Sequence, residues 1–240
     1  MTDAPRTDIT IILDRSGSMG TISEDAIAGF NRFVDDQLAL PGDARMTLVQ
    51  FDDRHEIVYD AVPLRDVPAM THDSFQPRGA TALHDAIGKT IRHTKTRLAA
   101  MPAAERPTQV VCVVITDGYE NASHEFDRPL VADMIRHQRE QADWRFLFFG
   151  ANQDAVKEAD SLGIDQASAM TFESSGEGAR KAFRSISRSI SSFRAGSLRA
   201  ELSTEDRPTD PDSKQGSSKH PSSKHRSSKR PSSKKPGSAS

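Results

Sequence analysis

The sequence predicts a doubly wound α/β fold: a mostly parallel β-sheet, covered by helices on both faces, with one antiparallel strand at an edge. Three observations support this fold class. Short apolar segments alternate with amphipathic segments of helical period up to about residue 193. The most apolar short segment, residues 109–116, lacks polar alternation, which is typical of a strand buried on both faces. One pair of strands is joined by a turn too short for a parallel crossover.

The first strand and helix are predicted from apolar spacing. Residues 8–13 form a short β-branched run, which favours a buried strand. The loop that follows contains Gly17 and Gly20, which we expect to permit tight turns. Residues 23–40 repeat apolar side chains at helical spacing, so they predict a helix with Ser23 as its N-cap.

A hairpin and a second helix come next. Residues 45–51 and 55–62 are predicted strands, and the short connection between them makes them antiparallel. Asp52 and Asp53 occupy this connection, for which a solvated turn is the favoured interpretation. Residues 82–100 then show the apolar spacing of a helix.

The C-terminal half continues the same alternation. Residues 109–116 are the predicted central strand. After it we expect helix, strand, helix, edge strand and helix, at residues 129–141, 144–150, 154–162, 167–171 and 176–193.

Charge is divided unevenly along the chain. Its 240 residues include 32 Lys and Arg and 34 Asp and Glu, for a net charge of −2. Residues 213–240 hold eight of the basic residues and no acidic one, which leaves a net charge of −10 in the rest. A five-residue repeat that begins Ser-Ser-Lys runs through this end and cannot bury apolar surface. We therefore predict one folded domain over residues 1–196 and a disordered basic tail over residues 197–240.

Composition also excludes several classes of protein. Cys112 is the single cysteine and lies in an apolar run, so a disulfide framework and a cysteine zinc cluster are excluded. No apolar stretch has the length of a membrane span. The N-terminus lacks the basic and apolar regions of a secretory signal. We therefore expect a cytoplasmic protein that makes no membrane contact.

Polar side chains gather where the predicted strands end. Asp14, Ser16 and Ser18 follow the first strand, Asp117 follows the central strand, and Thr81 precedes the second helix. These loops belong on one rim of the sheet, where open α/β sheets bind their ligands. Two carboxylates and three hydroxyls suit a hard divalent cation, Mg²⁺ first and Mn²⁺ or Ca²⁺ next. Catalysis would need a nucleophile with a base, and no histidine or thiol belongs to this set.

These pieces resemble the metal-ion-dependent adhesion site of von Willebrand factor A domains. Their order and their strand–loop context both match, and the resemblance extends over roughly residues 7–193. It implies that Ser16 and Ser18 ligate the metal directly and that Thr81 does so directly or through water. It implies that Asp14 and Asp117 act mostly through waters or as hydrogen-bond partners.

The resemblance implies a binding module and no enzyme activity. Neutral hydroxyl ligands leave the ion much of its charge, and an open coordination position then favours an Asp or Glu carboxylate from a partner protein. The missing membrane anchor and leader fit the bacterial intracellular members best. Those members work beside ATPases or in stress-response and tellurite-resistance-type systems.

Two alternatives stay open. One is a metal-dependent phosphoesterase or nuclease, although the phosphoryl-transfer enzymes with an aspartate after the first strand need a second one where Ser16 stands. In the other, the tail binds nucleic acid or another polyanion weakly and the domain is a scaffold. Two further features are weighed in the same way. Residues 119–124 fit a partner-facing rim and an ordinary loop equally well. His84 is favoured as a structural or surface residue.

Overall fold

A six-stranded sheet, ordered β3-β2-β1-β4-β5-β6, forms the centre of the computed structural model. The structure describes residues 6–151, 155–197 and 201–202, all within one unit of the chain, residues 1–208. The predicted start of a helix at Asp154 and residues 198–200 and 203–240 of the predicted tail lie outside the described residues. The strands are β1 (Thr7–Asp14), β2 (Ala44–Phe51), β3 (His55–Pro63), β4 (Gln109–Thr116), β5 (Arg145–Ala151) and β6 (Ala169–Phe172).

The pairing of the strands confirms the predicted fold class. β1 lies between β2 and β4 and is parallel to both, and β4–β5 and β5–β6 are also parallel. Only the β2–β3 pair is antiparallel among the described strands, and β3 is an edge strand. All eight residues of β1 are buried, as expected for a strand covered on both faces.

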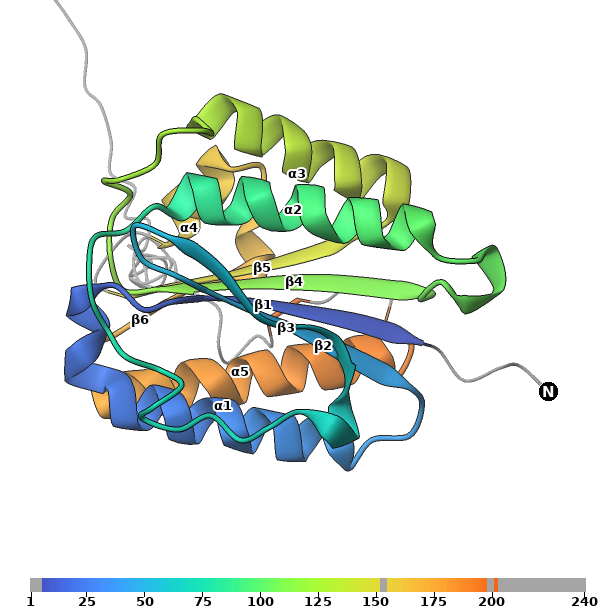
Figure 1. Cartoon of the computed structure of the whole chain (residues 1–240), viewed down its shortest axis with the longest axis horizontal. Coiled ribbons are helices and arrows are strands. Elements are labelled where there is room, and N and C mark those ends of the chain that lie inside the picture. Colours follow the sequence, from blue (N-terminus) through green and yellow to red (C-terminus); the bar gives the residue numbers. More distant parts are fainter. Residues whose placement is uncertain (1–5, 152–154, 198–200, 203–240) are drawn as a thin grey trace, which may run out of the picture. The chain divides into compact units, whose positions relative to one another are not determined.

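Helices cover the sheet on both faces, as Figure 1 shows. α1 (Ser23–Leu38) and α5 (Gly176–Arg194) lie side by side on one face, and α2 (Leu83–Ala100) and α3 (Arg128–Ala142) lie on the other. The short helix α4 (Ala155–Ser161) contributes to the same core as α2 and α3. Alternate residues of β1 point to the two cores: Ile11 and Leu13 to the α1–α5 side and Ile12 to the α2 side.

One local expectation at the first loop is wrong. The residues after β1 form a 3₁₀ helix, Gly17–Ile22, which turns tightly although neither Gly17 nor Gly20 has a positive φ. Ser23 is the first residue of α1 rather than its N-cap, and its hydroxyl donates to the carbonyl of Gly20 at 3.3 Å. Because the 3₁₀ turn runs directly into α1, the helix needs no side-chain cap at that point.

The folded body includes a residue beyond the last helix. Leu202 is 2 % exposed, belongs to the α1–α5 core and donates its backbone N–H to Ala167 at 3.0 Å. The predicted domain boundary at residue 196 stays a prediction, but the apolar core extends six residues past it.

Candidate functional site

The carboxyl ends of β1 and β4 bring the predicted residues together. Leu13 of β1 is paired with Ile115 of β4, so the loops that follow both strands leave the sheet side by side. Asp14 is the last residue of β1, Ser16 and Ser18 lie in the first loop and its 3₁₀ turn, and Asp117 lies in the second loop. Thr81 lies in the segment that enters α2 from the same rim.

Asp14 is a buried carboxylate held by two donors. Its side chain is completely buried, Oδ1 accepts the backbone N–H of Ser16 at 2.6 Å, and Oδ2 accepts the hydroxyl of Thr116 at 2.6 Å. Burial raises the pKa of Asp14 to about 6, although both hydrogen bonds act in the opposite direction. A nearby positive charge would stabilise the ionised form of this buried carboxylate.

The two serines connect Asp14's loop to Asp117. Ser16 and Ser18 place their Oγ atoms 3.1 Å apart, and the Ser18 hydroxyl donates to Oδ1 of Asp117 at 2.6 Å. The other carboxylate oxygen of Asp117, Oδ2, is buried and has no hydrogen-bond partner among the described residues. Burial raises the pKa of Asp117 as well. A buried carboxylate oxygen without a donor is costly. A positively charged group or a hydrogen-bond donor at this atom would therefore stabilise the site.

Thr81 lies against the loop that carries Asp117. A Cβ on Gly118 would come within 2.8 Å of the Thr81 hydroxyl oxygen, so a glycine is needed for this approach. Thr81 donates its N–H to Oδ1 of Asn121 at 2.9 Å, and Asn121 returns its own N–H to the Thr81 carbonyl at 3.0 Å. Thr81, only 3 % exposed, is therefore fixed in position by the loop that carries Asp117.

The segment 119–124 supports the start of α2, and its role toward a partner stays a prediction. Glu120 accepts the backbone N–H of His84 at 2.9 Å, which caps the start of α2. It also accepts the N–H and the hydroxyl of Ser123, both at 2.7 Å, so this part of the segment is a structural support. Tyr119 is 67 % exposed beside the site, where a partner could contact it.

His84 packs in the same support, which fits the structural role favoured for it. It is buried, with Nδ1 3.7 Å from Glu120 and Nε2 4.0 Å from Glu158 on α4.

Asp52 contradicts the solvated turn expected from the sequence. Its side chain is completely buried, whereas that of its neighbour Asp53 is exposed as predicted. Asp52 Oδ2 lies 3.1 Å from Nε of Arg15 and 2.9 Å from Nε of Arg78. The sequence carries no local signal for this burial, because it depends on two arginines from other segments.

The donor set fits a hard divalent cation. The five side chains offer only oxygen atoms, three of them hydroxyls, and the orphaned Oδ2 of Asp117 lies beside the hydrogen-bonded serines. The described residues contain no group of three or more His, Cys, Asp or Glu that could hold a metal. A site built here would therefore depend on hydroxyl groups as much as on carboxylates.

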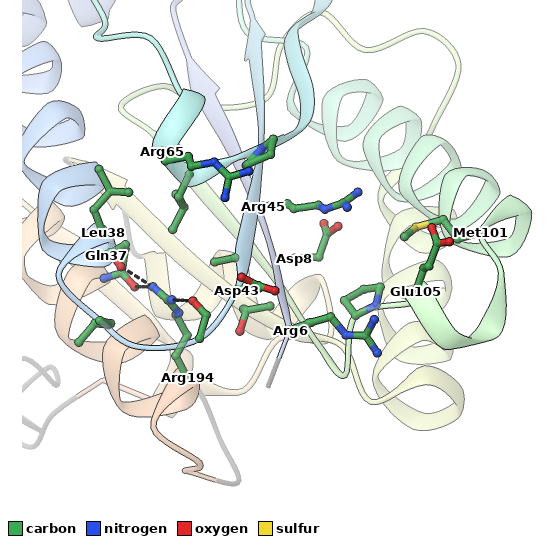
Figure 2. Close-up of a pocket in the computed structure, with 17 residues that line it drawn as sticks. Arg6, Asp8, Gln37, Leu38, Asp43, Arg45, Arg65, Met101, Glu105 and Arg194 are labelled. Atoms are coloured by element: carbon green, nitrogen blue, oxygen red, sulfur yellow. Dashed lines mark hydrogen bonds between the residues drawn. The ribbon is translucent and has the colours of Figure 1, made fainter. Parts of the chain in front are cut away.

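A separate cavity of about 400 Å³ lies at the opposite end of the sheet, where β1 and β2 begin (Figure 2). Arg194 reaches into it from α5, but its guanidinium donates to the carbonyls of Gln37 at 2.6 Å and Gly42 at 3.1 Å. Asp8, at its inner end, is paired with Arg97 at 2.9 Å. These charged groups are used in holding the fold, and none of the five predicted site residues lines this cavity.

The family model of the von Willebrand factor type A domain matches residues 8–185, which is most of the chain. The chain belongs to this family. The match spans β1 to the middle of α5 and includes every loop at the candidate site. No curated protein matches the sequence.

Solved structures share the vWA fold at low identity. Proximal thread matrix protein 1 from the mussel byssus is 17% identical, with a TM-score of 0.57 over 78% of this chain and 47% of that chain. A further structure of it, described as having a zinc occupied MIDAS motif, is 17% identical, with a TM-score of 0.55 over 80% of this chain and 47% of that chain. A von Willebrand factor type A protein from Catenulispora acidiphila is 17% identical, with a TM-score of 0.52 over 76% of this chain and 42% of that chain.

This chain spans less than half the length of these three structures. At such identities the likeness shows the fold alone. Among the residues that the structure describes, no helix is long and apolar enough to cross a membrane.

Proposed function

We propose that this vWA domain is a divalent-metal-dependent protein-binding module. Asp14, Ser16, Ser18, Thr81 and Asp117 would hold the ion, with Mg²⁺ as the expected metal and Mn²⁺ or Ca²⁺ as substitutes. The observation that carries the proposal is the buried, unpartnered Oδ2 of Asp117 next to two hydroxyls whose oxygens are 3.1 Å apart. A structurally similar protein is described as having a zinc occupied MIDAS motif, which supports a metal site in this fold.

The chain's own groups would divide the work as follows. Ser16 and Ser18 would supply neutral oxygen ligands, and Thr81 would supply a third, directly or through water. Asp14, tied to Ser16 N–H and Thr116, would hold the first loop and accept hydrogen bonds from bound waters. When bound, the metal would supply a positive charge with an open position for an Asp or Glu carboxylate of a partner protein.

Exposure of the rim favours binding over turnover. Ser18 and Tyr119 are exposed, whereas Asp14, Ser16 and Thr81 are buried, so a partner would meet the metal from one side. Desolvation of a charged contact at the centre of an interface makes it a dominant contribution to affinity. A cytoplasmic bacterial setting and a role in stress response stay predictions of the resemblance.

The test is metal-dependent capture from a lysate of the source organism by the full-length, immobilised protein. Wild type, Ser16→Ala/Ser18→Ala and the control Thr21→Ala/Ser23→Ala would each be run in Mg²⁺ and in EDTA. The control removes two nearby hydroxyls that contact only backbone carbonyls. We expect a protein captured by wild type and control in Mg²⁺ and lost in EDTA and in the double variant. Identical capture in every lane would contradict the proposal.

A hydrolysis assay separates the enzyme alternative. A generic phosphodiester hydrolysed with Mg²⁺ by wild type, and not by Ser16→Ala/Ser18→Ala, would replace the binding proposal by a catalytic one. Deletion of residues 213–240 separates the alternative in which the tail binds, because that binding would survive EDTA and fail without the tail.

A further inference from the structure

Asp52, at the carboxyl end of β2, holds two arginines with one carboxylate. Its Oδ1 accepts the N–H of Arg54 at 2.7 Å, which closes the β2–β3 turn. Its Oδ2 accepts Nε–H bonds from Arg15 at 3.1 Å and from Arg78 at 2.9 Å. With three donors already in place, Asp52 binds arginine and is not a candidate metal ligand.

Both arginines belong to segments that carry candidate metal ligands. Arg15 lies between Asp14 and Ser16 in the chain, and Arg78 lies three residues before Thr81. The Arg15 side chain is only 7 % exposed, so its charge is taken out of water and depends on its carboxylate partners. Asp52 therefore connects the loop of the two serines to the segment of Thr81.

Backbone hydrogen bonds repeat this connection. Arg78 donates its N–H to the Arg15 carbonyl at 2.8 Å, and Gly17 donates to the Gly79 carbonyl at 3.2 Å. The carbonyl of Asp52 accepts the N–H of Ala82 at 2.8 Å, directly after Thr81. Three segments far apart in the sequence are thus joined around one side chain.

Gly79 shows how closely these segments approach one another. Its φ is +69°, and a Cβ there would lie 2.4 Å from Oδ1 of Asp53 and 3.4 Å from Cβ of Asp52. A side chain at this position would be strained and would push the Thr81 segment away from the turn. The separation of the two ligand-bearing segments is consequently set by contacts at the β2–β3 turn.

We propose that Asp52 is a positioning residue for the metal site, acting through Arg15 and Arg78. The inference rests on the proposed function. Loss of the Asp52 charge leaves Arg15 buried without this partner and releases Arg78. The distance between the serine loop and the Thr81 segment is then no longer fixed. Outer residues that orient ligands commonly change metal affinity 10- to 100-fold. We expect Asp52→Asn to weaken Mn²⁺ binding at least about tenfold.

A second buried aspartate provides a matched control. Asp8, 2 % exposed at the start of β1, holds the guanidinium of Arg97 through both carboxylate oxygens, at 2.9 and 3.0 Å. It lies at the opposite end of the strand from Asp14. Asp8→Asn should lower thermal stability, because it breaks a buried ion pair. It should leave Mn²⁺ affinity within about twofold of wild type.

The experiment is a Mn²⁺ titration of the full-length protein, followed by the electron paramagnetic resonance of free Mn²⁺. It compares wild type, Asp52→Asn, Asp8→Asn and Arg78→Gln, with folding checked by circular dichroism. Support is a tenfold or larger loss of affinity in Asp52→Asn and a smaller loss in Arg78→Gln, with Asp8→Asn unchanged. If Asp52→Asn does not fold, the Mn²⁺ affinity of Arg78→Gln tests the positioning role instead, because the Arg78 side chain is half-exposed. We then expect Arg78→Lys to retain part of the affinity that Arg78→Gln loses.

Three results would overturn the inference, and they have different consequences for the proposed function. In the first, wild type binds Mn²⁺ and Asp52→Asn binds it with equal affinity, or Arg78→Gln does so where Asp52→Asn does not fold. This result removes the positioning role and leaves the proposed function intact. An equal loss in Asp8→Asn also removes it, because the effect is then one of stability. Absence of Mn²⁺ binding in wild type removes the proposed function and the positioning role together.

Discussion

The burial of Asp14 destabilises the metal-free fold when this carboxylate is ionised. Burial raises its pKa to about 6, whereas the pKa in the unfolded chain is 3.8, so between these values only the folded protein is largely protonated there. Between these two values the folded state holds more protons at this site, so its contribution to stability falls as the pH rises. Above about pH 6 the ionised carboxylate destabilises the metal-free fold.

We therefore expect Asp14→Asn to raise the free energy of unfolding in EDTA at pH 8, by about 1–3 kcal/mol. The amide can accept the Ser16 N–H and donate to Thr116, whose hydroxyl also lies 3.1 Å from the Gly118 carbonyl. Urea unfolding of both proteins at pH 4 and pH 8 measures this, and the advantage of the variant should shrink at pH 4. A variant less stable than wild type at pH 8 would contradict the argument.

The candidate site was predictable in part. Asp14, Ser16, Ser18, Thr81 and Asp117 could be proposed because each follows a strand or precedes a helix on one rim. Asp52 could not, because an aspartate in a short turn is normally solvated and its burial depends on two arginines from other loops. Asn121 and Glu120 were not predicted as supports, because their roles depend on hydrogen bonds to the backbone of Thr81 and His84, distant in the sequence.

At the scale of elements, the alternation of strands and helices was predictable and several ends were not. The strand over residues 109–116 was predicted with its observed limits, because its apolar run is bounded by polar residues. α1 ends at Leu38, two residues before the predicted end, and the loop before it forms a 3₁₀ turn. Such ends depend on backbone hydrogen bonds that the apolar period does not encode.

The α1–α5 pair gives a prediction at this scale. A Cβ on Gly29 would lie 2.4 Å from the ring of Phe183, so the two helices pack with no room for a methyl group. Gly29→Ala should destabilise the protein by about 1–3 kcal/mol, despite the better helix propensity of alanine.

Gly20→Ala is the matched control for Gly29→Ala. A Cβ there would meet only Pro77, at 3.9 Å, so we expect a change within about 0.5 kcal/mol. Thermal unfolding of the two variants measures the difference. Equal stability of both would show that α1 and α5 can separate at no cost.

For the whole molecule, charge divides the chain into two parts of opposite sign. Residues 213–240 carry eight basic residues against a net −10 in the rest. We expect deletion of residues 213–240 to leave the thermal midpoint and Mn²⁺ affinity of the protein unchanged, since the described core ends at Leu202. The same deletion should abolish retention on duplex DNA at low salt.

Salt dependence tests the tail prediction further. With eight cations, log affinity of the full chain for DNA should fall against log salt with a slope no steeper than about −7. DNA binding that survives the deletion would place the polyanion site on the folded domain instead.

The position of the bound metal decides most directly whether these five residues form a metal site. A crystal of the full-length protein grown with Mn²⁺ and measured for anomalous scattering would locate the ion. We expect an anomalous peak at the carboxyl ends of β1 and β4, from an ion bound by Ser16 and Ser18 with Asp14, Thr81 and Asp117 around it. No peak there, or an ion coordinated by other residues, would contradict the proposed metal site.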